Sequence, residues 1–208
     1  MTKTIKTEVL VVGEGSAGLT AALAASEAGA DVLLLYSAQA SSTAISTGFL
    51  TYAAHDGFTQ DEALQAMAET TGKGLCDISL LERFIEQAPV EMADILTRYD
   101  IPTERAPKGY RVRRAPGKRG KDLLNDSYGQ DGGKDMTSLM MEFSSTHGTA
   151  LFSQLRKAAR QSNIRRLKGV ALSLLSDGPA VWADIDGEPA KIMARAVILA
   201  TGGMARCL

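Results

Sequence analysis

The sequence predicts an α/β fold in which helices cover a mainly parallel β-sheet, and three features support this class. An apolar strand at 9–12 leads into a glycine-rich turn and then into a helix over about 16–28. A second apolar strand at 31–36 completes a βαβ unit, from which parallel sheets are built. Further along the chain, a third apolar strand at 196–199 leads into the glycine pair at 202–203.

The turn after the first strand has the spacing Gly-x-Gly-x-x-Gly. Gly13 permits the tight turn, Gly15 lets a phosphate approach the backbone, and Gly18 lets helix and strand pack closely. The helix is expected to begin at Ser16 and Ala17, whose N–H groups are free. The helix dipole at this end favours an anion such as a diphosphate. Because strand, turn and helix agree, the segment predicts a Rossmann-like dinucleotide site.

The end of the second strand departs from the usual pattern of such sites. An Asp or Glu commonly stands there and accepts hydrogen bonds from the adenosine ribose. This chain has Tyr36 and Ser37, whose neutral hydroxyls form hydrogen bonds worth about 0.5–1.5 kcal/mol, against about 1.5–3 kcal/mol for a charged group. Glu14, inside the glycine turn, either compensates for this or points to solvent.

Composition excludes several classes of protein. A chain of 208 residues that is 45% hydrophobic suits one large domain, or one domain with an insertion, and its net charge of −1 gives no reason to expect nucleic acid as a partner. With Cys76 and Cys207 as the cysteines and His55 and His147 as the histidines, we expect no metal site. Without an adequate apolar leader or a stretch of about 20 apolar residues, we expect a soluble, cytoplasmic protein with no membrane span.

Small, uncharged residues follow the second strand, over 37–49. Their backbone amides and hydroxyl groups can lie against a ligand, and an ordinary polar loop is the alternative. The candidate ligand-binding residues in this stretch are Ser42, Thr43, Ala44, Ser46, Thr47 and Gly48. The corresponding candidates after the last strand are Ala200, Thr201, Gly202 and Gly203.

The middle of the chain is predicted to be mainly helical. Helical spacing of apolar residues covers 61–70, and Pro89 is expected to start a further helix. Asp77 is placed to cap the helix between them, whose apolar stripe consists of Leu80, Leu81, Phe84 and Ile85. These stripes indicate core packing. A helix over 147–161 then returns the chain to the sheet.

Residues 108–121 carry seven basic side chains and no acidic one. A solvated loop, a site for a substrate anion or an acidic partner, and a nucleic-acid contact are the alternatives, in that order of preference. Residues 125–133 are expected to form a surface loop. Short alternating segments over 164–192, separated by turn signals, predict a small antiparallel meander in which Trp182 covers apolar surface.

Five segments of the chain match motifs of one protein group, in the group's order. They are the Gly13 fingerprint, Thr43-Ala44-Ile45-Ser46-Thr47-Gly48, Gly72-Lys73-Gly74-Leu75-Cys76-Asp77, the Ala88-Pro89 break and Ala200-Thr201-Gly202-Gly203. By these residues the chain resembles the flavoprotein subunits of the fumarate reductase, succinate dehydrogenase and L-aspartate oxidase group.

The resemblance implies an FAD-binding domain formed by 1–56 and 146–208, with a capping insert over 57–145. It also implies hydride exchange between flavin N5 and a small dicarboxylate, and contact of adenine with backbone near Ala171. Members that attach FAD covalently have a histidine where this chain has Ser42, so noncovalent FAD is expected. In this group further residues follow the second glycine signal and complete the site, so a longer polypeptide or a partner chain, which could also transfer electrons, is expected to supply them.

One substrate-binding position also differs from the group. The group's substrate histidine corresponds to Thr149, and His147 lies two positions earlier as a candidate proton relay. No catalytic residue is assigned. Besides an FAD-dependent oxidoreductase, the sequence leaves open an NAD(P)-binding Rossmann protein and a non-catalytic scaffold derived from a flavoprotein.

Overall fold

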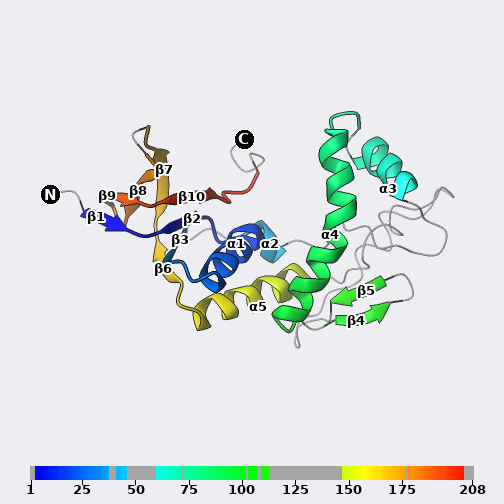
Figure 1. The fold of residues 1–208 in the computed structure, drawn as a ribbon, viewed down its shortest axis with the longest axis horizontal. Coiled ribbons are helices and arrows are strands. Elements are labelled where there is room, and N and C mark those ends of the chain that lie inside the picture. The colour runs from blue at the N-terminus through cyan, green and yellow to red at the C-terminus, as the bar shows by residue number, and fades with distance from the viewer. Residues whose placement is uncertain are drawn as a thin grey trace. The chain divides into compact units, whose positions relative to one another are not determined.

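A computed structural model describes most of the chain, namely residues 3–37, 41–45, 60–71, 73–101, 103–106, 109–112, 147–176 and 178–203. The chain divides into two compact units, of which one comprises Met1–Ala44 with Leu151–Leu208 and the other Ile45–Ala150 (Figure 1). No helix among the described residues is long and apolar enough to cross a membrane.

The first unit contains a four-stranded parallel sheet whose strand order is β10-β2-β3-β6. Its strands are β10 (Ala196–Leu199), β2 (Val9–Val12), β3 (Val32–Tyr36) and β6 (Arg165–Lys168). The central strands β2 and β3 are continuous apolar runs because both of their faces are covered. Helix α1 (Ser16–Glu27) covers one face, and Gly29, at φ +87°, lies just beyond its end. The predicted α/β class is confirmed.

A second four-stranded sheet, in the order β1-β9-β8-β7, packs on the other face of the parallel sheet. Its strands are β1 (Lys3–Lys6), β9 (Glu188–Met193), β8 (Ala180–Ile185) and β7 (Val170–Leu174). Strands β7, β8 and β9 form the predicted antiparallel meander. The meander is shorter than predicted, because residues 165–168 instead pair in parallel with β3. Strand β1, with one apolar residue among four, had too weak a pattern to be predicted.

One apolar core lies between the two sheets. Alternate residues of the parallel sheet, such as Leu10 and Leu35, meet Val181 and Ile192 of the meander, and all four are at most 1% exposed. The chain passes from one sheet to the other between β6 and β7 at Gly169. A Cβ atom at Gly169 would lie 2.6 Å from the Asp184 carbonyl oxygen, so only glycine fits this crossing.

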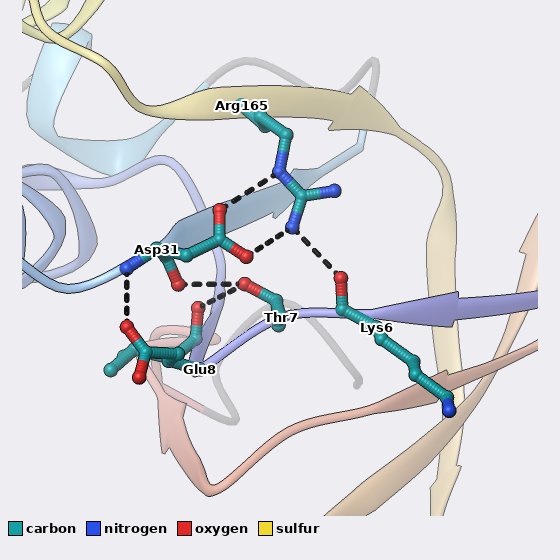
Figure 2. Close-up of polar contacts among 6 residues, drawn as sticks. Lys6, Thr7, Glu8, Asp31 and Arg165 are labelled. Atoms are coloured by element: carbon teal, nitrogen blue, oxygen red, sulfur yellow. Dashed lines mark hydrogen bonds and ion pairs between the residues drawn. The ribbon is translucent and has the colours of Figure 1, made fainter.

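Polar contacts join the amino ends of β2, β3 and β6 (Figure 2). Arg165 donates to both carboxylate oxygens of Asp31, at 3.1 and 2.7 Å, and to the Lys6 carbonyl at 2.8 Å. The Thr7 hydroxyl donates to the Asp31 carbonyl at 2.8 Å, and the Glu8 carboxylate accepts from the Asp31 amide at 2.9 Å. These contacts hold β1, β2 and β3 in register where the chain leaves the second sheet for the first.

The second unit is mainly helical in its described residues. Helix α3 (Gln60–Ala66) continues into a π-helical turn, η1 (Met67–Thr71), and helix α4 (Ile78–Arg98) follows. The Asp77 carboxylate accepts from the Leu80 amide at 3.2 Å and caps α4, as predicted.

The predicted helix break at Pro89 is wrong, because α4 is continuous through it. Proline lacks an N–H group and so removes one hydrogen bond from the helix. The helical turns before and after it keep their backbone hydrogen bonds, so the helix continues. The apolar stripe predicted for the first part of this helix is also wrong in part, because some of its residues are exposed. Ile85 is 3% exposed, whereas Leu80 is 62% and Phe84 39% exposed.

Two further elements complete the described part of the chain. A hairpin of β4 (Thr103–Ala106) and β5 (Gly109–Val112) contains part of the basic segment that was expected to lack regular structure. The rest of that segment, and the predictions for 125–133, lie outside the described residues. Helix α5 (His147–Gln161) has the predicted bounds, and Leu155 is fully buried. Ala159, also fully buried, takes the inward position that was expected for Ala158.

Candidate functional site

The glycine-rich turn joins β2 to α1 at the carboxyl edge of the parallel sheet. The Gly13 amide donates to the Leu35 carbonyl at 2.9 Å, and Gly13 has φ +113°, which L side chains rarely adopt. A Cβ atom on Gly13 would overlap the Ala200 carbonyl oxygen, and one on Gly18 would overlap the Gly13 carbonyl oxygen. Both glycines are therefore required for the protein to pack against itself.

Gly15 is in a different environment. Its backbone is extended, at φ −86°, and it immediately precedes α1. The nearest atoms to a Cβ at this position would be the hydroxyl oxygens of Ser41 at 3.5 Å and Thr43 at 3.7 Å, which are ordinary contact distances. Packing of the protein therefore does not require glycine at this position.

The second glycine signal lies beside the first. Strand β10 pairs with β2 so that Leu199 is opposite Val12, and the Ala200 amide donates to the Val12 carbonyl at 2.8 Å. Residues 201–203 follow at the same edge of the sheet and are exposed. Gly202 has φ +83° and open space around it, so its backbone conformation is the feature that requires glycine.

Part of the small-residue stretch lies against the start of α1. Residues Ser42–Ile45 form the short helix α2. The Thr43 hydroxyl accepts from the Ser16 amide at 2.9 Å and donates to the Ser16 hydroxyl at 3.2 Å. The Ser41 hydroxyl accepts from the Thr43 amide at 3.2 Å. Three hydroxyl groups therefore gather beside Gly15, while Ser46, Thr47 and Gly48 lie outside the described residues.

The end of β3 is adjacent to β6. The Tyr36 carbonyl accepts from the Gly169 amide at 2.9 Å, and the guanidinium group of Arg166 lies over the Tyr36 ring, 4.7 Å from its centre. Ser37 follows as an exposed residue. On β7, the Ala171 side chain packs against the core between the sheets, so any contact it makes with a ligand is through its backbone.

Glu14 does not point to solvent. Its side chain is 9% exposed, and its Oε1 atom accepts from Arg156 Nε of α5 at 3.2 Å and from the guanidinium group of Arg166. Arg156 also lies over the Phe152 ring, 5.2 Å from its centre.

Sequence reasoning did not identify either arginine as part of this region. Arg166 lies in β6 opposite Leu34, a fully buried residue of β3, so its guanidinium group requires a partner close by. This pairing joins segments that are distant in the chain, so no local pattern in the sequence indicates it.

The backbone of His147 begins α5, but its side chain, and His55 altogether, lie outside the described residues. No cluster of candidate metal ligands occurs in the described parts of the chain.

Comparison with known protein families places these features in context. A sequence model for the FAD binding domain matches residues 8–208. The chain belongs to this FAD binding domain family. The geometry at the sheet edge fits such a cofactor, because packing does not require the glycine at Gly15 and hydroxyl groups lie beside it.

This FAD binding domain is similar to proteins about three times its length. It is 29% identical over 203 residues to the L-aspartate oxidases of Mycobacterium bovis and Mycobacterium tuberculosis, covering 95% of this chain and 35% of theirs. Its fold matches E. coli quinol fumarate reductase FrdA with a TM-score of 0.74 and 24% identity, over 99% of this chain and 34% of that one. It matches Mycobacterium smegmatis Sdh1 with a TM-score of 0.69 and 20% identity, over 98% of this chain and 35% of that one. The predicted family resemblance is confirmed.

Proposed function

We propose that this chain is the FAD-binding part of a flavoprotein oxidoreductase, which holds FAD noncovalently at the carboxyl edge of the parallel sheet. The observation that carries the proposal is the contrast among the three fingerprint glycines. Gly13 and Gly18 serve the packing of the protein, whereas packing does not require a glycine at Gly15. When bound, FAD supplies hydride transfer through its N5 atom.

Each group of candidate residues has its own role in this proposal. The amides of Ala17 and Gly18 hold the diphosphate at the start of α1, and Ser16 contributes through its hydroxyl group, since its amide donates to Thr43. The adenosine lies toward Tyr36, Ser37 and Ala171. The flavin ring lies between two sets of small residues, which are Ser42, Thr43, Ala44, Ser46, Thr47 and Gly48 on one side and Ala200, Thr201, Gly202 and Gly203 on the other.

The noncovalent state of the cofactor and the role of Gly15 are tested together. Purified protein should be yellow, and denaturation should release free FAD, whereas flavin that remains attached to denatured protein would contradict a noncovalent site. Gly15→Glu should abolish FAD binding, because its side chain and charge would occupy the diphosphate position. Ala24→Glu is a matched control, since it adds the same side chain at an exposed position of α1 away from the glycine turn. Unchanged flavin content in Gly15→Glu would refute the proposed placement.

The reaction of the whole protein is also a proposal. The relatives include an L-aspartate oxidase and a fumarate reductase, and we propose a small dicarboxylate as the substrate class. Because the chain spans about a third of these relatives, the rest of the substrate site is proposed to come from further residues or from a site-completing or electron-transferring protein partner. A cytoplasmic location is proposed from the free thiol of Cys76.

A further inference from the structure

The carboxylate of Glu14 has one oxygen in use and one available. Both arginine contacts are made to Oε1, and Oε2 has no hydrogen-bond partner among the described residues. The side chain is nevertheless 91% buried, since it is 9% exposed. Among the described residues, Oε2 is not one of the fully buried side-chain atoms that lack a partner, so a donor group of a ligand or an ordered water can reach it.

Arg166 connects Glu14 to the end of β3. Its guanidinium group binds Glu14 and also lies over the Tyr36 ring. The end of β3 is where dinucleotide-binding folds usually place the carboxylate that accepts the ribose 2′-hydroxyl, and Tyr36 and Ser37 supply none. Glu14 therefore brings a carboxylate, from the glycine turn, to the region where that group is missing.

We propose that Glu14 is the specificity residue for the adenosine ribose, and that its Oε2 atom accepts a hydrogen bond from the 2′-hydroxyl. Arg156 and Arg166 are positioning residues that fix Oε1 and so direct Oε2. This inference rests on the proposed function, that the unit binds FAD.

The test compares two cofactors in the same protein. The dissociation constants of the flavin-free protein for FAD, and for the FAD analogue whose adenosine ribose lacks the 2′-hydroxyl, are measured by quenching of flavin fluorescence. The wild-type protein should bind FAD about 10- to 100-fold more tightly than the analogue, because the analogue leaves a charged acceptor unpaired. In Glu14→Gln this ratio should fall toward one. Glu188→Gln, at an exposed position on β9, is the control and should keep the wild-type ratio.

Three outcomes would overturn the proposal. The first is equal affinity of the wild-type protein for FAD and the analogue. The second is a ratio of the two dissociation constants that is the same in Glu14→Gln as in the wild type. The third is a ratio that falls toward one in Tyr36→Phe but not in Glu14→Gln. A purely structural role for Glu14 would weaken binding of both cofactors equally. If Glu14→Gln does not fold, Glu14→Asp keeps the charge but shortens the reach, and its ratio should also fall. Failure of the wild-type protein to bind FAD at all would instead refute the proposed function.

Discussion

At the scale of single residues, the fingerprint glycines are required for two different reasons. Sequence spacing alone predicted a tight turn at Gly13 and close packing at Gly18, and both features are present. The environment of Glu14 could not be predicted, because its partners Arg156 and Arg166 lie more than 140 positions away in the sequence. Ion pairs over such separations are set by the tertiary fold and leave no local pattern.

The packing role of two of these glycines leads to a stability prediction. Gly13→Ala and Gly18→Ala should each lower the free energy of unfolding by about 3 kcal/mol or more, because a Cβ would overlap a carbonyl oxygen. Gly15→Ala should change it by less than about 1 kcal/mol, since its Cβ would make ordinary contacts. Urea denaturation of the three variants measures the difference, and equal destabilisation at all three positions would contradict it.

Glu8 gives a prediction about pH. The Asp31 amide, and then the Arg195 side chain, lower the pKa of Glu8 below its ordinary value of 4.5. A carboxyl group whose pKa is lower in the folded state stabilises the fold above its unfolded pKa, and this contribution is lost as the pH falls through the folded pKa. Stability of the wild-type protein should therefore decline below about pH 4.5, and Glu8→Gln should decline less. Thermal melts from pH 6 to pH 3 test this, with Glu188→Gln expected to follow the wild type.

At the scale of elements, strong and continuous patterns were predictable and weak or conflicting ones were not. Strands β2, β3 and β10 and helices α1 and α5 follow apolar runs or helical spacing near their observed positions. Strand β6 was assigned to the wrong sheet, because its sequence Arg-Arg-Leu-Lys has one apolar residue and its partner β3 is distant in the chain. At Pro89, a strong local signal for a helix end was overridden by the helical turns on both sides.

The proline within α4 should reduce the stability of that helix. Because Pro89 has no N–H group, the Ile85 carbonyl lacks its usual helical partner. Pro89→Ala should raise the free energy of unfolding by about 1–3 kcal/mol, as measured by urea denaturation with circular dichroism. Val90→Ala, at a position 68% exposed, is the control and should raise it by no more than about 0.6 kcal/mol. A lower stability of Pro89→Ala than of the wild type would contradict this prediction.

At the scale of the whole molecule, the parallel sheet and the second sheet depend on one shared core. Leu10 of β2 and Ile192 of β9 are both fully buried in it. The fold class and the family could be predicted from the sequence, because the two glycine signals and the helices between them are local patterns. Which face of the sheet the meander covers, and how β1 joins it, could not, because these depend on pairings between distant segments.

A shared core predicts that both sheets unfold together. Trp182, the sole tryptophan of the chain, reports on β8, and release of bound flavin reports on the parallel sheet. Both signals should show the same thermal midpoint, and Leu10→Ala and Ile192→Ala should each lower the stability seen by both signals by about 2–5 kcal/mol. Leu172→Ala, at a position 63% exposed, is the control and should have little effect. Two separate midpoints would show that the sheets unfold independently.

The division of the first unit into two chain segments has a consequence for biosynthesis. Strands β2 and β3 emerge early from the ribosome, but β6 to β10 follow only after residues 45–150 have been translated. At about 5–20 residues per second, this interval of 106 residues lasts roughly 5–20 s. During that time the nascent chain exposes the apolar strands at 9–12 and 32–36, so this is when a molecular chaperone would be needed most.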